Sequence, residues 1–438
     1  MSRPSDNINL LPYEDLYRHF HAHPELSNCE EQTSEKCKSH LSSLSPAFKI
    51  HTHIGGYGLV GILANGPGKT IMLRADMDAL PILESTGLEY ASNVKAIGPD
   101  GVETSVMHAC GHDMHMTCLL AAAEVLVKMR ETWSGTLVVL FQPAEERGSG
   151  ARAMVEDGLY SGDRFGSEGE RVPVPDFILG QHVMAMRAGS VGLRSGTIMA
   201  GADSLKITLY GKGGHGSQPH RTVDPAVLAA HVIVRLQSVV SREVGYNDVA
   251  VLTVGSVNVG KSENVIADEA VLGVDFRSTG REVREQLMGA VDRVVRAECR
   301  ASGCSREPRI ERTRELPTTV NHEAMTHRLG RRFKEFFGEE NFDSEIPVTT
   351  IAEDFSVLAG VKGEDGRERE VPYVFWHWGC VEEESWDRMV GEGRVGEIPM
   401  NHSSGFRPVI QPTLRTGVDA LVVGALEFFG EGREGAKL

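Results

Sequence analysis

The sequence lacks long hydrophobic runs and an excess of basic residues. No segment approaches the roughly 20 apolar residues of a membrane-spanning helix, and the N-terminus has no uninterrupted apolar core like that of a signal peptide. The formal net charge is -16, with Lys and Arg scattered along the chain, which disfavours nucleic acid and anionic membranes as partners. We therefore expect a soluble protein with neither partner.

Cysteine is also scarce. The 438 residues contain seven, in odd number and at uneven spacing, unlike a secreted disulfide framework, and this favours a reducing, cytoplasmic location. The C-terminal residues Ala436, Lys437 and Leu438 differ by one small residue from the Ser-Lys-Leu peroxisomal signal. A peroxisomal location is therefore the alternative.

The chain is too long for one ordinary core, and its hydrophobic pattern predicts an α/β protein of two domains. Apolar runs at 71–76, 136–141 and 177–180 alternate with a helix at about 113–130, as expected for a mostly parallel central sheet. The charged segment 381–397 is predicted to be a surface loop.

The pattern changes after about residue 200. Residues 201–317 have the order strand, helix, strand, strand, helix, strand, which is the ferredoxin-like βαββαβ order. We interpret this segment as a domain inserted into a catalytic domain made of residues 1–200 and 318–438.

Several possible metal ligands follow the predicted strands. Asp76 and Asp78 follow one strand, Glu145 and Glu146 another, and His182 a third. Open α/β sheets bind ligands at the carboxyl ends of their strands. These side chains are therefore expected to share one edge of the sheet.

Two short motifs place metal ligands beside a spare carboxylate. His-Ala-Cys-Gly-His at 108–112 contains Cys110 and His112. An isolated pair with this spacing is more often a structural cysteine beside a helix-capping histidine. Glu145 and Glu146 could be only a solvated acidic turn. Together the motifs favour a catalytic metal site, with Glu146 as ligand and Glu145 as base.

The remaining candidates are ordinary when taken one by one. His182 and His402 could complete a ligand set, although a lone histidine is more often structural. His215 lies in the glycine-rich segment 213–217, which could be a plain turn. Asn264 and Arg277 could be ordinary loop and strand residues, although Arg suits a carboxylate ligand.

Motifs along nearly the whole chain resemble one family. They are RADMDALP at 74–81, MHACGHDMHM at 107–116, FQPAEERGSGA at 141–151, GQHV at 180–183, GGHGSQPH at 213–220, NVIADEA at 264–270, AEDFS at 352–356 and NHSSGF at 401–406. The chain resembles the metal-dependent amidohydrolases that include hippurate hydrolase, N-acyl-amino-acid amidohydrolases and auxin-conjugate hydrolases, relatives of aminoacylase and carboxypeptidase G. Arg147 and Ser149 depart from the family's more glycine-rich pattern.

The resemblance implies a ligand set and a reaction. Two divalent ions, manganese or zinc with cobalt possible, would be held by Cys110, His112, Glu146, His182 and His402, with the Cys110 thiolate bridging them. Glu145 would be the general base and Asp78 would orient a ligand.

The same resemblance assigns roles to the inserted domain. It would be a lid and dimerisation domain, so that the protein is a homodimer or a higher homo-oligomer. His215 would stabilise the oxyanion from a partner's lid, and Asn264 and Arg277 would lie near the substrate carboxylate.

The function implied is hydrolysis of the amide bond of N-acyl amino acids to a carboxylic acid and a free amino acid. A dipeptidase or carboxypeptidase on the same scaffold is the main alternative. A non-catalytic, metal-stabilised binding protein is a further alternative, which the spare Glu145 disfavours.

Overall fold

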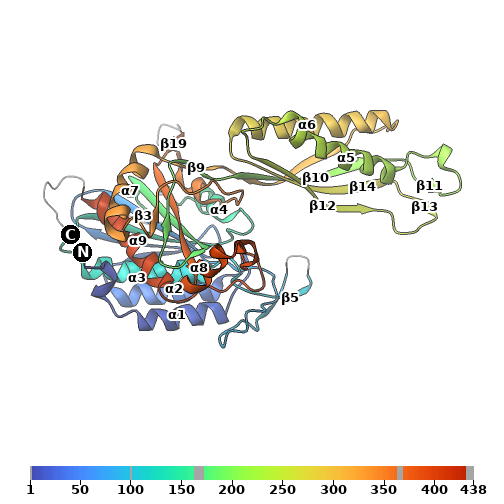
Figure 1. The fold of residues 1–438 in the computed structure, drawn as a ribbon. Coiled ribbons are helices and arrows are strands. Elements are labelled where there is room, and N and C mark those ends of the chain that lie inside the picture. The colour runs from blue at the N-terminus through green and yellow to red at the C-terminus, as the bar shows by residue number, and fades with distance from the viewer. Residues whose placement is uncertain (1, 99–100, 162–171, 363–367, 431–438) are drawn as a thin grey trace. The chain divides into compact units, whose positions relative to one another are not determined.

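The computed structural model describes residues 2–98, 101–161, 172–362 and 368–430 (Figure 1). The tripeptide 436–438, which resembles a peroxisomal signal, lies outside these residues. All seven cysteines are described, and within this part of the chain none forms a disulfide. No described helix combines the length and apolar character needed to span a bilayer.

The chain divides into two compact units. The larger unit comprises Met1–Ile198, Val320–Pro347 and Asp354–Leu438, and the smaller unit comprises Met199–Thr319 and Val348–Glu353. The inserted segment expected at 201–317 lies within the smaller unit. The short stretch Val348–Glu353 also belongs there, and nothing in its sequence indicates this.

The larger unit is built on an eight-stranded sheet of order β1-β2-β6-β3-β7-β20-β8-β17. Its strands are β1 (Lys49–Ile54), β2 (Gly58–Asn65), β3 (Thr70–Asp76), β6 (Gly135–Gln142), β7 (Phe177–Arg187), β8 (Val191–Gly192), β17 (Phe342–Asp343) and β20 (Tyr373–Val381). The central strands β6, β3, β7 and β20 are parallel, while β1, β2 and β8 pair antiparallel. The predicted mostly parallel sheet is confirmed.

The helices of the larger unit cover this sheet. They are α1 (Leu11–Ala22), α2 (Glu31–Leu44), α3 (His112–Lys128), α4 (Gly150–Glu156), α7 (Glu323–Phe337), α8 (Glu383–Gly391) and α9 (Thr413–Phe429). α3 and α9 are almost wholly buried because they pack against each other and against the sheet. The helices α1 and α2 cover the outer side of α3. Burial on both faces explains why β6 contains an unbroken apolar run from Leu137 to Phe141. The loop predicted at 381–397 is wrong, because α8 occupies its first part.

The smaller unit is a four-stranded antiparallel sheet of order β12-β14-β10-β15 with two helices. Its elements are β10 (Gly201–Tyr210), α5 (Pro225–Glu243), β12 (Ala250–Val259), β14 (Glu269–Ser278), α6 (Arg281–Ala301) and β15 (Arg309–Leu316). Asp224 begins α5 by accepting the backbone N–H of Ala226 at 2.8 Å. The ferredoxin-like prediction is confirmed.

Short elements complete the chain. They are β4 (Lys95–Ile97), β5 (Glu103–Ser105), β9 (Gly196–Met199), β11 (Gly214–His215), β13 (Val265–Ile266), β16 (Thr319–Asn321), β18 (Gly360–Lys362) and β19 (Glu368–Glu370).

Candidate active site

The larger unit gathers the five predicted ligands from four segments. Cys110 lies in the loop before α3 and His112 is the first residue of that helix, while Glu146 lies in the turn after β6. His402 lies in a turn before α9. His182 lies within β7, which continues to Arg187, and not beyond the end of a strand as expected.

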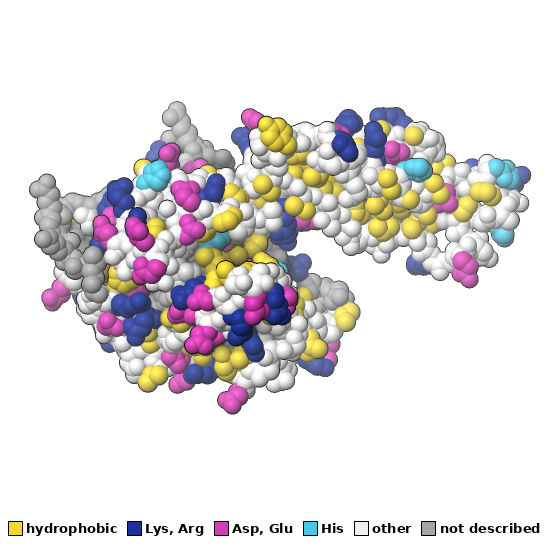
Figure 2. Space-filling model, in the orientation of Figure 1, with side chains coloured by type: hydrophobic (Ala, Val, Ile, Leu, Met, Phe, Trp, Pro, Cys, Tyr) yellow, Lys and Arg dark blue, Asp and Glu magenta, His cyan; other side chains and the backbone are white. Residues whose placement is uncertain are grey.

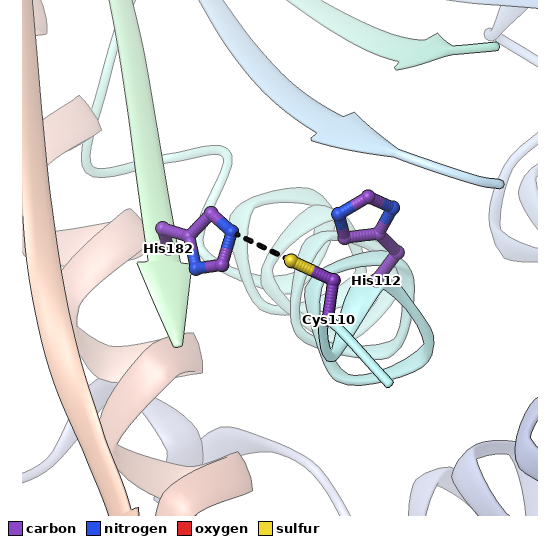
Figure 3. Close-up of side chains that lie close together, drawn as sticks. All are labelled: Cys110, His112 and His182. Atoms are coloured by element: carbon purple, nitrogen blue, oxygen red, sulfur yellow. Dashed lines mark hydrogen bonds between the residues drawn. The ribbon is translucent and has the colours of Figure 1, made fainter. Parts of the chain in front are cut away.

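Cys110 stands at the centre of this cluster. The ligand atoms of Cys110, His112 and His182 all lie within 4.8 Å of one another, and so do those of Cys110, Glu146 and His402. The Cys110 sulfur lies 3.4 Å from His182 Nε2 (Figure 3), and Glu146 Oε1 lies 3.3 Å from His402 Nε2. Two overlapping groups of three donors therefore share one sulfur.

The buried histidines present one nitrogen to the cluster and use the other elsewhere. His112 Nδ1 donates to the Asp78 carbonyl oxygen at 2.8 Å, and His182 Nδ1 donates to the Val183 carbonyl oxygen at 2.8 Å. Each Nε2 then faces the cluster, where the neutral ring presents the lone pair that a metal ligand requires.

The donor atoms fit divalent cations. His112 Nε2 and Glu146 Oε1 are buried, and neither has a hydrogen-bond partner within the described ranges. Buried polar atoms without partners are costly, and a cation bound by thiolate, imidazole and carboxylate would satisfy them.

Burial and nearby carboxylates oppose the charged form of Cys110. A helix N-terminus favours a thiolate, but burial, followed by the carboxylates of Glu146 and Glu145, raises the pKa of the Cys110 thiol. Burial opposes the charge of His112, yet Asp76 and Asp78 raise the pKa of His112 to about 10. Bound cations would reverse this local balance and deprotonate the thiol.

Asp78 holds the paired glutamates by their backbone. Its two carboxylate oxygens accept the N–H groups of Glu145 at 3.1 Å and Glu146 at 3.0 Å. Ser27 donates its hydroxyl to the same carboxylate at 2.6 Å. Asp78 thus orients Glu146 and the predicted base together, in addition to His112 through its carbonyl.

A second buried network lies behind the ligands, and the sequence analysis missed it. Asp76 accepts hydrogen bonds from Arg74 at 2.6 Å and from His115 Nδ1 at 2.5 Å, and His115 Nε2 accepts the Val183 N–H at 3.0 Å. The His115 ring packs edge-on to the His182 ring, with centroids 4.6 Å apart. Its spacing of three residues from His112, on one helix face, was the available signal.

The turn carrying the glutamates has a constrained backbone. Ala144 has φ 49, in the left-handed region that non-glycine residues rarely adopt. Gly150 approaches so closely that a Cβ there would lie 1.5 Å from the Pro143 carbonyl oxygen. Between them, Arg147 and Ser149 are exposed.

The three predicted substrate-contacting residues lie in the smaller unit. His215 and Asn264 are neighbours, since Gly216 donates its N–H to the Asn264 carbonyl at 2.8 Å, and both are exposed. His215 Nδ1 lies 2.8 Å from the Ser217 hydroxyl. Arg277 lies on β14, with Nε 3.2 Å from Asp275 and a second nitrogen donating to the Thr350 carbonyl at 2.8 Å.

Known proteins share this sequence and fold. Hippurate hydrolase of Campylobacter jejuni is 34% identical over 81% of this chain and 89% of its own length, and thermostable carboxypeptidase 1 of Saccharolobus solfataricus is 32% identical over 94% of both chains. The structure of the Bacillus subtilis YXEP protein, a dinuclear metal-binding peptidase of the M20 family, superposes with a TM-score of 0.70 at 25% identity, covering 95% of this chain and 98% of that chain.

The family model for peptidase family M20/M25/M40 matches residues 72–375, which include four of the five proposed ligands and Glu145. The resemblance inferred from the motifs is therefore confirmed. This chain belongs to peptidase family M20/M25/M40 and is a hydrolase of amide bonds.

Proposed function

We propose that this enzyme hydrolyses the amide bond of N-acyl amino acids to a carboxylic acid and a free amino acid, at two divalent cations. The observation that carries the proposal is the pair of overlapping donor groups that share Cys110. One cation would be held by Cys110, His112 and His182, and the other by Cys110, Glu146 and His402. Manganese, zinc and cobalt all accept this mixture of thiolate, imidazole and carboxylate ligands.

The cations would lower the pKa of water and polarise the substrate carbonyl. Glu145 takes a proton from the attacking water, whose oxygen bonds to the carbonyl carbon, and returns that proton to the departing nitrogen as the C–N bond breaks. Asp78 keeps Glu145 in position through its backbone N–H. His215 would stabilise the oxyanion, and Asn264 and Arg277 would bind the substrate carboxylate.

Replacing the proposed base tests this role. Glu145→Gln should lower kcat by about 10³-fold or more while the bound metal, measured by elemental analysis, stays at the wild-type level. Glu156→Gln, at an exposed position on α4, is the matched control and should leave kcat unchanged. Retained turnover in Glu145→Gln would exclude Glu145 as the base.

The alternative substrate class is a peptide, and the similarity to a carboxypeptidase keeps it open. A panel of N-acyl amino acids, including hippurate, and of dipeptides with the same C-terminal residues separates the two activities. The proposal requires the acyl series to have the higher kcat/KM.

We further propose that two copies associate through the smaller unit. Val227, Ala230, His231 and Val234 form one exposed stripe on α5, where Val227 is 55% and Val234 73% exposed. The neighbouring β12 is an edge strand with exposed valines at 251 and 257. Figure 2 shows hydrophobic side chains gathered on this unit. An edge strand can pair with its own copy about a two-fold axis.

The mass in solution tests this association. Val234→Asp should convert a dimer into a monomer in light scattering after gel filtration, whereas Val390→Asp, at a 50% exposed valine on α8, should not. A wild-type protein that is monomeric at micromolar concentration contradicts the proposal.

A further inference from the structure

The loop before α2 reaches the turn that carries the paired glutamates. Glu30 is wholly buried, and its Oε1 accepts the backbone N–H of Ala144 at 2.8 Å and that of Asn28 at 2.9 Å. Ala144 immediately precedes Glu145. One carboxylate therefore ties the start of α2 to the backbone beside the proposed base.

Both residues that donate to Glu30 have a left-handed backbone. Asn28 has φ 66 and Ala144 has φ 49. Asparagine tolerates this region, but alanine does not adopt it readily because its Cβ crowds the following carbonyl. Ala144 therefore needs an external hydrogen bond to hold its conformation, and Glu30 supplies one.

Glu30 and Asp78 together accept the backbone N–H groups of three successive residues. Glu30 accepts the N–H of Ala144, and Asp78 accepts those of Glu145 and Glu146. Ser27, in the same loop as Glu30, donates to Asp78. The loop is therefore connected to the turn by two hydrogen-bonded routes. Glu30 binds the turn directly, and Ser27 does so through Asp78.

We propose that Glu30 is a positioning residue, which fixes the turn at Ala144 and so aims Glu145 and Glu146. The proposal deepens the proposed function, on which it rests only for the roles of the two aimed carboxylates. Burial and the charge of Asp78 raise the pKa of Glu30 to about 7. Both backbone N–H groups donate to the single oxygen Oε1, and an amide oxygen can accept them in its place. An amide side chain should serve as well.

Kinetics of three variants test the proposal. Glu30→Ala should lower kcat by about 10- to 100-fold with little change in KM, since misplacement of a reacting group by about 1 Å costs on that order. Glu30→Gln should stay within about threefold of wild type, because it keeps the acceptor. Glu31→Ala, at the exposed neighbouring carboxylate, is the matched control and should leave kcat unchanged.

A double variant separates positioning from a general loss of structure. Glycine adopts positive φ without strain, so Ala144→Gly should restore several-fold of the kcat lost in Glu30→Ala. Failure of Ala144→Gly to restore kcat, or a Glu30→Gln variant as impaired as Glu30→Ala, overturns the proposal. If Glu30→Ala does not fold, the shorter Glu30→Asp replaces it.

Hydrogen exchange of the metal-free protein provides a readout that needs no activity. Amides in the peptide 141–149 should exchange about tenfold faster in Glu30→Ala than in wild type or Glu31→Ala, because the hydrogen bond of Ala144 is lost. Unchanged exchange overturns the proposal. A wild-type protein that hydrolyses neither N-acyl amino acids nor peptides would instead refute the proposed function, and the exchange result would still decide the role of Glu30.

Discussion

The proposed metal-binding histidines of the larger unit and His215 of the smaller unit differ in how their rings are held. In the larger unit, His112 and His182 are almost fully buried, and each has its second nitrogen bonded to a backbone carbonyl. In the smaller unit, the His215 side chain is exposed, and its Nδ1 is hydrogen-bonded to the near neighbour Ser217. The first arrangement sets geometry before any ligand arrives, whereas the second leaves the ring free of such constraint.

Metal removal should have the largest effect. Chelation followed by dialysis should lower turnover by about 10³-fold or more, because metal stabilisation of the transition state is worth several kcal/mol. The far-UV circular dichroism should remain, since protein hydrogen bonds already hold the ligands of the larger unit. Unfolding on mild chelation would instead indicate a metal-stabilised binding protein.

Replacing His115 tests how strongly the buried network holds the histidines of the larger unit. His115→Ala leaves Asp76 and the Val183 N–H without their partner, so the free energy of unfolding should fall by about 3 kcal/mol and metal affinity by about tenfold. Urea unfolding and metal titration measure both. His327→Ala, at an exposed position on α7, should change neither quantity.

A buried histidine near the site should make stability depend on pH. Burial opposes the charge of His21, but hydrogen bonds to Asp113 and Glu84 raise the pKa of His21 from 6.5 to about 9. Between pH 6.5 and about 9, the folded protein therefore keeps a proton on His21 that the unfolded chain has lost. The stabilisation is fully present below pH 6.5 and is lost, up to about 3 kcal/mol, as the pH rises through 9.

Unfolding at several pH values measures this loss. His21→Asn, which has no titratable ring, should lack the decline above pH 6.5. An unchanged pH dependence in that variant would show that other groups cause it.

His215→Ala should have the smallest effect on the protein itself. Because the ring is exposed, the free energy of unfolding should change by less than about 0.5 kcal/mol, and metal content should stay at the wild-type level. Turnover should nevertheless fall. A measurable loss of stability would show that the segment around His215 is more constrained than the exposure of its ring indicates.

The hydrophobic pattern was sufficient to predict the central sheet and the order of elements in the smaller unit, because periodicity is a local property of the sequence. Positions after strands predicted that Glu145, Glu146 and His182 share one edge of the sheet, whereas the ligand set centred on Cys110 came from the resemblance to a known family. The extension of β7 beyond His182 and the helix α8 were missed because the segments are short and mixed in polarity.

Contacts between distant segments could not be predicted. The pairing of Glu30 with Ala144 joins residues 114 positions apart, and the bonds of His21 to Asp113 and Glu84 join α1 to two other segments. Nothing in the periodicity of either partner indicates such a bond. The positive φ of Ala144 is likewise imposed by tertiary contacts, since alanine has no preference for it.

The turn between Ala144 and Gly150 has constrained ends and exposed side chains between them. The Glu30 carboxylate holds Ala144, and the Pro143 carbonyl leaves no room for a Cβ atom at Gly150. The side chains of Arg147 and Ser149, between these two ends, are exposed. Substitutions at these two positions should therefore leave the carboxylates beside them in place.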